Sequence, residues 1–488
     1  MPSSTRGHVL APPFLLLSCL FLACHHTQLV AASTASSYDR RSCEAAVLEW
    51  SAKEKLALNN QLHPVQHEGV KILDLLFFLH IPRTGGRTYH QCFLKNLYLP
   101  KDRCPRSYDK LRLDLSQPSC KLLSSHDDMS ILNKIPSRTS VVTNMRNPVD
   151  RVLSTYEFSV EVAARFLRLK SINSSRSPLP RANSPSELVS TLTIWPWKYL
   201  VPFMQHDIFA RRDARREGKV DWPPSSNTTY DAPTITMPLT EFIHHPVAHE
   251  LVHNGATFQV AGLTNNSYEE GSVVIRKCIS QYPKLGYQVL DVAKRRLDSM
   301  LFVGLTEKHQ ESATTFFSLV GDQVQVQSEA LKGILDPNTS VPVQEKNPPN
   351  LLLAAYKSCL TSLRSSHAVR RASTLQLISP VRYSQEERDL IPSSVVDKII
   401  YLNKLDMELH EYAKFLYAKQ QKRFEASTSP QIKEGQIVVL SMFLVLCITL
   451  SVLLLGFALM LRVRNRVGND WVPFWLRRLA FMQAHEKL

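Results

Sequence analysis

The sequence predicts an α/β fold built on a largely parallel central sheet. Three short, continuous apolar runs, at 75–79, 140–145 and 301–303, are typical of strands buried on both faces. Helical stretches separate these runs, as in sheets whose parallel strands are joined by crossover helices. The first run leads through a turn with two glycines into a helix that we expect over 89–99. Strand, glycine turn and helix together predict a P-loop-like phosphate loop.

Composition and charge describe a globular protein with an anionic partner. The chain has 488 residues, of which 44% are hydrophobic and 21% are charged, as in ordinary globular domains. Its formal net charge is +15. A protein this basic is expected to bind a nucleotide, a sulfated glycan or an acidic peptide.

The first 32 residues have the pattern of a signal peptide. Arg6 precedes an apolar run over 14–23, which is too short to cross a bilayer. The small residues at 31–33 then offer a cleavage site for signal peptidase. We therefore expect a cleaved signal peptide over 1–32, with a retained signal anchor as the alternative.

A second hydrophobic segment, 437–461, predicts a transmembrane helix. It contains no charged residue and is long enough to cross the hydrocarbon core of a bilayer. The residues that follow it at once include Arg462, Arg464 and Arg466, so the positive-inside rule places the tail 462–488 in the cytosol. With a short stalk at 426–436, the chain is expected to be a single-pass type I membrane protein.

The portion between the two hydrophobic segments has the features of a secretory protein. Its N-glycosylation sequons lie at Asn173, Asn227, Asn265 and Asn338. Its six cysteines are Cys43, Cys92, Cys104, Cys120, Cys278 and Cys359. An even number of cysteines in an oxidising compartment predicts disulfides, and six cysteines leave 15 possible pairings open. The same compartment excludes nucleic acid as a partner.

A helical lead-in is expected over 33–70, before the main domain. The helical spacing of its apolar residues Ala45, Leu48, Ala52 and Leu56 indicates this helix.

The main domain is expected to span 71–425. Within it, 171–240 is rich in Pro, Ser and basic residues and predicts irregular surface insertions. The four prolines of 336–350 predict a further loop. Apolar residues at helical spacing predict one amphipathic helix over 395–424.

The predicted phosphate loop, 80–88, is rich in donors for anion oxygens. Gly85 and Gly86 allow the backbone to close on a phosphate without a clash from a Cβ atom. Further donors are the side chains of Arg83, Thr84, Arg87 and Thr88. The nucleotide triphosphatase pattern requires a glycine where Ile81 stands, so we expect phosphate binding without the metal of NTP hydrolysis. The alternative is a plain glycine turn with surface arginines.

Two sequence motifs follow the first two predicted strands. The first is His80-Ile81-Pro82-Arg83-Thr84-Gly85-Gly86-Arg87-Thr88, and the second covers 145–154 and contains Arg146 and Ser154. They resemble the 5′-phosphosulfate loop and the 3′-phosphate motif of the heparan sulfate 6-O-sulfotransferase family. Segments 304–307 and 402–407 resemble later blocks of the same family.

The resemblance implies a PAPS-dependent sulfotransferase fold, where PAPS is 3′-phosphoadenosine 5′-phosphosulfate. It also implies that all nine loop residues, Arg146 and Ser154 bind this donor, and that no metal is required. A guanidinium and a hydroxyl suit a shared phosphate, because both donate hydrogen bonds to its oxygens. The alternative for Arg146 is an ion pair with an acid near the strand end.

Two positions depart from the family pattern. The loop lysine of the family is Arg83 here, which cannot give up a proton but can neutralise charge on the bridging oxygen during transfer. We therefore expect Arg83 to be catalytic. The aspartate of the second motif is Asn147, which removes a negative charge beside the nucleotide.

The expected topology selects one branch of this resemblance. A type I protein with a C-terminal anchor is similar to the plant tyrosylprotein sulfotransferases, whereas the animal glycan enzymes with such a domain are type II. The similarity implies transfer of sulfate from PAPS to tyrosine hydroxyls of acidic, secreted peptide precursors in the Golgi lumen. The alternatives are a glycan O-sulfotransferase with the same donor site and a donor-binding protein without turnover.

His126 is the predicted catalytic base. Segment 124–129 resembles the family block whose histidine is the proposed base, and tyrosine, with a pKa near 10, needs a base at the pH of the Golgi. The alternative is a solvated histidine at a helix start, where Ser and Asp are common caps. Asp127 and Asp128 are the rival bases.

Three other features compete with this interpretation. The H-E-x-x-H pattern at 249–253 fits a zinc protease, but Asn254 and Gly255 predict that the helix ends directly after it. The basic run 211–216 suits either an acidic peptide or a solvated face. Arg370 and Arg371 could reach the donor, but no pattern assigns them a role.

Overall fold

The computed structural model describes most of the chain between residues 38 and 467. The described ranges are 38–61, 71–104, 120–135, 138–170, 191–222, 228–320, 323, 348–428 and 434–467. The chain divides into two units, residues 1–424 and 425–488. The predicted signal peptide lies outside the described residues, as do most of the predicted cytosolic tail and the sequons at Asn173, Asn227 and Asn338.

A parallel sheet forms the centre of the first unit, as the sequence predicts. Its described strands are β1 (Leu75–Leu79), β2 (Leu122–Ser125), β3 (Thr139–Met145) and β4 (Phe302–Leu305), in the order β2-β1-β3-β4. All neighbouring strands pair in parallel. β1 and β3 lie where the apolar runs predict them, and β4 is displaced by one residue at its start. β2 is missing from the prediction because only its two leucines are apolar.

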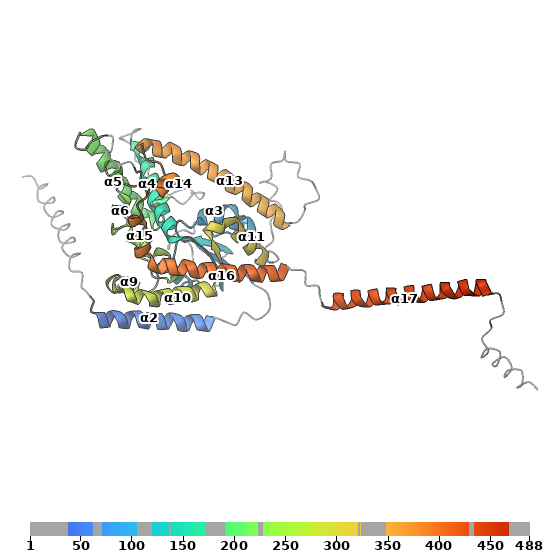
Figure 1. Ribbon diagram of the computed structural model, residues 1–488. Coiled ribbons are helices and arrows are strands. Elements are labelled where there is room, and N and C mark those ends of the chain that lie inside the picture. The colour runs from blue at the N-terminus through green and yellow to red at the C-terminus, as the bar shows by residue number, and fades with distance from the viewer. Residues whose placement is uncertain are drawn as a thin grey trace, which may run out of the picture. The chain divides into compact units, whose positions relative to one another are not determined.

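Helices of the first unit surround the sheet (Figure 1). In chain order they are α2 (Arg40–Gln61), α3 (Gly86–Cys92), α4 (Pro148–Lys170), α5 (Trp197–Arg216), α6 (Leu239–Phe242), α7 (His249–Val252), α8 (Gly255–Val260), α9 (Ser272–Gln281), α10 (Gly286–Ser299), α11 (His309–Val320), α13 (Pro348–Leu375), α14 (Gln385–Asp389), α15 (Ser393–Leu402) and α16 (Lys404–Thr428).

Three helices differ from the prediction. α5 lies within 171–240, where the sequence predicts irregular structure, and it holds Pro202 in its interior because a regular apolar face packs against α4. α3 begins and ends earlier than the expected helix, and a short 3-10 helix (Leu94–Leu97) follows it. The helix predicted over 395–424 is divided into α15 and α16 at Asn403, whose side chain donates to the carbonyl oxygens of Val252 and Ile399.

The lead-in helix α2 forms within the predicted range, and long-range contacts decide which of its faces is buried. The apolar residues Leu48 and Leu56 are exposed, with 52% and 63% of their surface accessible. The buried side chains are instead Cys43, Val47, Trp50, Ser51, Glu54 and Leu58. A disulfide from Cys43 and a buried ion pair between Glu54 and Arg296 fix this orientation. These two specific contacts outweigh the burial of two leucines.

The six cysteines of the first unit form three disulfides, as their even number predicts. The pairs are Cys43–Cys278, Cys92–Cys359 and Cys104–Cys120. The first joins α2 to α9, and the second joins α3 to α13 across 267 residues of sequence. A link over so long a loop removes much conformational freedom from the unfolded chain.

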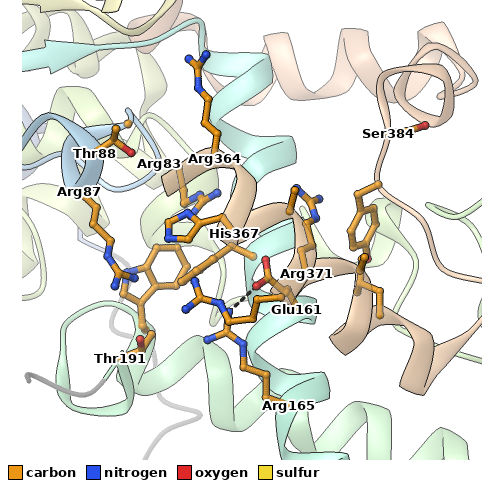
Figure 2. A pocket seen from close by; sticks show the side chains of 18 of the residues that line it. Arg83, Arg87, Thr88, Glu161, Arg165, Thr191, Arg364, His367, Arg371 and Ser384 are labelled. Atoms are coloured by element: carbon orange, nitrogen blue, oxygen red, sulfur yellow. Dashed lines mark hydrogen bonds and ion pairs between the residues drawn. The ribbon is translucent and has the colours of Figure 1, made fainter. Parts of the chain in front are cut away.

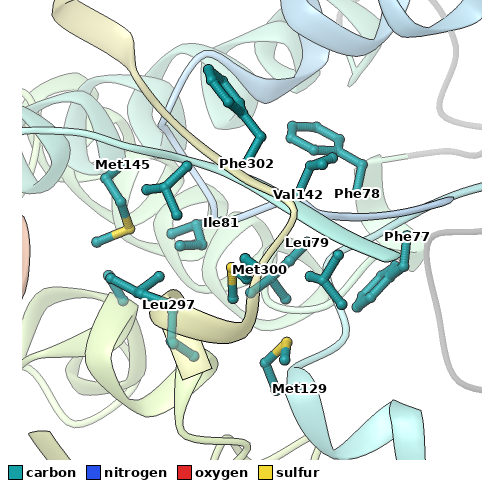
Figure 3. Close-up of a cluster of buried hydrophobic side chains, with 14 of the residues drawn as sticks. Phe77, Phe78, Leu79, Ile81, Met129, Val142, Met145, Leu297, Met300 and Phe302 are labelled. Carbon is teal, nitrogen blue, oxygen red and sulfur yellow. The ribbon is translucent and has the colours of Figure 1, made fainter. Parts of the chain in front are cut away.

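The core is formed on both faces of the sheet. Phe78, Val142 and Phe302 are register partners on neighbouring strands and point to one side, as Figure 3 shows. Phe77 and Leu79 point to the other side, toward Met129 and Met300 (Figure 3). This alternation explains why the strands are continuously apolar, since both faces are covered.

A buried ion pair ties α16 to α4 and α8. Arg151 and Asp406 are each 1% exposed and lie 2.7 Å apart. Asp406 also accepts hydrogen bonds from the backbone of Ala256 and from both the backbone and the hydroxyl of Thr257, so it caps the start of α8. The family block at 402–407 therefore has a structural role in this fold.

The helix α17 (Glu434–Val467) belongs to the second unit and contains the predicted transmembrane segment. Its stretch from Met442 to Arg466 is long and apolar enough to cross a membrane, and its described side chains are exposed. α16 extends to Thr428, so helix reaches into the segment assigned to the stalk.

Replacing Arg151 should show how much the fold depends on the buried pair. Arg151→Met leaves the Asp406 carboxylate buried without its cation, so we expect a loss of about 3–5 kcal/mol in the free energy of unfolding. The matched control is Arg138→Met, which breaks an exposed pair with Asp74 and should cost less than about 1 kcal/mol. Denaturant unfolding of the soluble domain measures both, and equal stability of the two variants would contradict this role.

Candidate active site

The carboxyl ends of all four described strands meet at one cavity of about 1090 Å³. His80 follows β1, His126 follows β2, Arg146 follows β3 and Thr306 follows β4. Each of these residues lines the cavity. Ligands of parallel α/β folds bind at this edge of the sheet, so the cavity is the candidate active site.

The phosphate loop lies against the sheet in a conformation that requires glycine. Gly85 has a φ of 72°, and a Cβ atom at Gly86 would overlap the ring of His80. Arg83 also has a positive φ, of 67°. Strain at a non-glycine residue in a loop is typical of ligand-binding turns. The loop then enters α3, whose first backbone N–H groups have no partners within the helix and suit an anion.

Residues after β4 hold the loop from its other side. The hydroxyl of Thr306 donates to the carbonyl oxygens of Thr84 (2.7 Å) and Met145 (3.0 Å), and thereby joins the loop to the end of β3. His309 donates to the carbonyl oxygen of Gly85 at 3.3 Å. The family block at 304–307 thus supports the loop.

Two partly buried arginines form the basic floor of the cavity. Arg83 donates from Nε and Nη2 to the hydroxyl of Ser154, at 2.9 and 2.8 Å, and its guanidinium lies 4.4 Å from the ring centre of Phe158. Arg146 donates to the carbonyl oxygen of Arg83 at 3.0 Å. Within the described residues Arg146 forms no ion pair, which disfavours the alternative of a purely structural salt bridge.

Burial destabilises both guanidinium groups. Burial, together with the neighbouring charge of Arg146, lowers the pKa of Arg83 to about 10. Burial also lowers the pKa of Arg146. Two partly buried cations this close are stabilised by an anion bound between them.

His126 is buried beside the loop and is not a solvated helix-start residue. Its Nδ1–H donates to the carbonyl oxygen of His80 at 2.7 Å, and the two rings stack with centres 4.2 Å apart. Because a carbonyl oxygen only accepts, Nδ1 carries the proton and Nε2 is the basic nitrogen. Burial lowers the pKa of His126 to about 4, so the ring is neutral at pH 6 to 7.

The neighbouring carboxylates are committed to structural hydrogen bonds. Asp127 accepts from Ser125 and Asn266. Asp128 accepts from the backbone and hydroxyl groups of both Ser130 and Thr264. Asp127 and Asp128 do not line the cavity, whereas His126 does. Of the three candidate bases, His126 is therefore the one that a substrate in the cavity can contact.

The structure brings most of the predicted site residues together. Those lining the cavity are His80, Arg83, Gly85, Gly86, Arg87, Thr88, His126 and Arg146. Ile81, Pro82 and Thr84 have buried side chains, and the Thr84 hydroxyl donates to the carbonyl oxygen of Ile81. These three residues therefore face away from the cavity and offer only backbone groups. Ser154 lies behind Arg83.

A wall of the cavity that the sequence does not predict comes from α4 and α13. Its charged residues are Glu161 and Arg165 of α4 and Arg364, His367, Arg370 and Arg371 of α13 (Figure 2). The basic residues of α13 recur at helical spacing, a signal that could have placed them on one face. The sequence could not show that this face meets the phosphate loop.

Glu157 of α4 anchors the end of this wall. It accepts from Arg371 at 2.9 Å, from Arg388 at 2.8 Å and from the hydroxyl of Tyr230 at 2.7 Å. Burial raises the pKa of Glu157, but Arg388 and Arg371 outweigh this effect and keep it below its ordinary value. The ionised carboxylate thereby fixes α13 and the chain after it against α4.

The competing patterns contribute to structure. α7 ends at Val252 as predicted, and the Nε2 atoms of His249 and His253 contact backbone carbonyl oxygens. Glu250 pairs with Arg276. No group of three or more His, Cys, Asp or Glu residues in the described ranges could hold a metal. In the run 211–216, Arg211 and Arg215 bind carbonyl oxygens of Pro233 and Thr234, which favours a structural face.

Comparison with known proteins extends the similarity beyond the motifs. No protein-family profile matches the chain. A curated protein of Arabidopsis thaliana, named protein-tyrosine sulfotransferase, is 44% identical to it over 409 residues, which cover 78% of this chain and 81% of that protein. The similarity therefore includes most of the chain, and not only the loop and the strand ends.

Proposed function

The chain belongs to the plant protein-tyrosine sulfotransferase family, and from this premise we propose that its cavity binds PAPS along the strand ends and an acceptor tyrosine beside His126. As a member of this family the chain is an enzyme that sulfates protein tyrosine residues, and a sulfotransferase implies PAPS as the donor. The convergence of loop, arginines and His126 on one cavity is the observation that carries the placement of both substrates.

The two anionic ends of PAPS match two groups of donors in the cavity. The phosphosulfate fits the backbone N–H groups of 85–88 at the start of α3, where the glycines leave room for its oxygens. The 3′-phosphate fits Arg146, which lines the cavity. Ser154 lies behind Arg83, and its hydroxyl joins the 3′-phosphate in this proposal when Arg83 turns toward the 5′-phosphate. Burial lowers the pKa values of Arg83 and Arg146. A bound anion offsets this effect because its negative charge stabilises both guanidinium groups. We therefore propose that the domain has the PAPS-dependent sulfotransferase fold.

His126 and Arg83 are the proposed catalytic residues. As the tyrosine oxygen attacks sulfur, its proton passes to Nε2 of His126, the unprotonated ring nitrogen. The new O–S bond forms while the S–O bond to the 5′-phosphate breaks, and the electron pair stays on that phosphate. Arg83 and the loop N–H groups neutralise the charge that develops there. The hydrogen bond from Nδ1 to His80 holds the ring in the required tautomer throughout.

The charge of the cavity supports acidic acceptor peptides. Among its described lining residues eight are arginines, namely Arg83, Arg87, Arg146, Arg165, Arg364, Arg370, Arg371 and Arg382, and Glu161 is the one carboxylate. PAPS brings roughly four negative charges, two of them on its 3′-phosphate. The surplus of positive charge favours an acidic, secreted tyrosine peptide as the second substrate.

We also propose that the enzyme is a type I protein of the Golgi membrane. This proposal is supported by the predicted signal peptide 1–32, by the apolar segment 437–461 and by the arginines of 462–488, which together favour a luminal catalytic domain. The sequon at Asn265 supports this, since its side chain is exposed and accessible to glycosylation.

Replacing His126 separates chemistry from donor binding. His126→Ala should lower kcat by about 10²–10⁴-fold, the contribution of a positioned base, while the affinity for 3′,5′-bisphosphoadenosine changes little. His249→Ala is a matched control outside the cavity and should retain the parent rate. Sulfate transfer to a tyrosine peptide measures both.

The pH dependence gives an independent check of the same base. Protonation of His126 removes the base, so kcat/KM of the parent should fall as the pH drops through about 4. In the previous experiment, a rate of folded His126→Ala within a few-fold of the parent rate would reject His126 as the base. In the pH experiment, a kcat/KM that does not fall at low pH would do the same.

Membrane topology can be tested in sealed vesicles. A tag after Leu488 should be digested by added protease, whereas the catalytic domain should be protected and should shift in size after glycosidase treatment. A protected tag would contradict the type I assignment.

A further inference from the structure

The carbonyl oxygen of Gly85, in the phosphate loop, is bound by groups outside the cavity. It accepts a hydrogen bond from His309 at 3.3 Å and the first helical bond of α3, from the backbone N–H of Tyr89, at 3.1 Å. His309 is buried and does not line the cavity, whereas Gly85 and Gly86 do. Because the C=O and N–H groups of a trans peptide point in opposite directions, the bond to His309 turns the N–H of Gly86 away from this histidine. This N–H is one of those to which we assign the 5′ end of the donor.

The hydrogen bonds of His309 determine its tautomer. A carbonyl oxygen only accepts, so Nε2 carries the proton and Nδ1 is the accepting nitrogen. The hydroxyl of Tyr356, which is fully buried, therefore donates to Nδ1. Burial lowers the pKa of His309, and the charge of Arg364 lowers it too, although the bond to Gly85 raises it. The ring is thus neutral, and its two hydrogen bonds run in one direction, from Tyr356 through His309 to Gly85.

The imidazole ring of His309 is enclosed by its neighbours. Tyr356 stacks on it with ring centres 5.9 Å apart, and Tyr89 packs against it edge-on at 5.6 Å. On the side of the loop, a Cβ atom at Gly85 would lie only 3.0 Å from Nε2. The position of the ring is therefore set by packing, and the ring directs one N–H donor at the loop.

Tyr356 connects this relay to α13, which packs against α3 and α11 (Figure 1). Three residues further along α13, Cys359 forms the disulfide with Cys92, the last residue of α3. α13 therefore holds α3 at both ends, through His309 at Gly85, which precedes its first residue, and through a covalent bond at its last. This double attachment restricts any tilt of the helix whose start forms the predicted anion site.

We propose that His309 and Tyr356 are positioning residues for the sulfuryl end of the donor: their relay holds the Gly85–Gly86 peptide so that its N–H points at the 5′-phosphosulfate. The inference rests on the proposed orientation of PAPS. A hydrogen bond to a carbonyl oxygen also polarises its peptide group, so the N–H of Gly86 becomes a stronger donor. This effect matters most while the S–O bond breaks and negative charge collects on the 5′-phosphate.

The test measures the affinity of the full chain for two nucleotides, 3′,5′-bisphosphoadenosine and adenosine 3′-phosphate, which lacks the 5′ group. His309→Leu should weaken binding of the bisphosphate by about 10-fold and leave that of adenosine 3′-phosphate nearly unchanged. It should also lower kcat for a tyrosine peptide without a matching change in the KM of the peptide. His309→Gln should restore most of both losses, because its amide can donate to Gly85 and accept from Tyr356.

Tyr356→Phe keeps the ring of His309 and removes only the donor to Nδ1. The proton of His309 can then move to Nδ1, which leaves Nε2 without a proton for Gly85. We therefore expect a smaller loss in the same direction, of about 3-fold for the bisphosphate alone. The matched control is Tyr412→Phe, which removes a hydroxyl bound to Asp298 outside the cavity and should change neither affinity.

The pair of nucleotides separates positioning from a general loss of structure. Equal weakening of both nucleotides by His309→Leu, or an unchanged affinity for the bisphosphate in Tyr356→Phe, would overturn the positioning role and leave the orientation of PAPS intact. Should His309→Leu fail to fold, Tyr356→Phe decides the question alone. A parent enzyme that binds the two nucleotides equally would instead overturn the proposed place of the 5′ end, and the positioning role with it.

Discussion

The close contact between His80 and Gly86 is the constraint on which the site depends. The ring of His80 occupies the space that a Cβ atom at Gly86 would need, so the phosphate loop lies directly on the end of β1. The ring of His80 also stacks on the ring of His126, and the backbone carbonyl oxygen of His80 accepts a hydrogen bond from Nδ1–H of His126. One residue thus fixes both the loop for the donor and the tautomer of the proposed base. A side chain at Gly86 would disturb both at once.

The walls of the cavity are held by residues that do not line it. Asp406 joins Arg151 of α4 to the start of α8, and Glu157 joins α4 to α13 through Arg371. The Cys92–Cys359 disulfide connects α3, which begins at the phosphate loop, to the same α13. The charged groups that we propose to contact substrates therefore rest on a framework of buried pairs and one covalent link. Such support holds several arginines close together around one cavity.

The sequence predicts those parts of the site that follow directly from a strand. The loop and Arg146 follow strands that the apolar runs predict, so local pattern and family resemblance together nominate them. His126 follows β2, which the apolar pattern misses, so the family resemblance alone nominates it. The wall formed by α13 is different, because its position depends on contacts over more than 200 residues of sequence, such as Glu157 with Arg371. The buried face of α2 could not be read from apolar spacing for a similar reason, since its contacts with Arg296 and Cys278 decide it. The spacing of apolar residues along the sequence does not predict long-range pairs of this kind.

The most direct test of the donor site is the relative affinity of two nucleotides for Arg146→Ala. If the 3′-phosphate lies on Arg146 and Ser154, this variant loses roughly 1.5–3 kcal/mol of binding free energy for 3′,5′-bisphosphoadenosine. Binding of adenosine 5′-phosphosulfate, which has no 3′-phosphate, should be nearly unchanged, and isothermal titration calorimetry of the folded domain measures both. Equal weakening of the two nucleotides would contradict the proposed orientation of the donor along the strand ends.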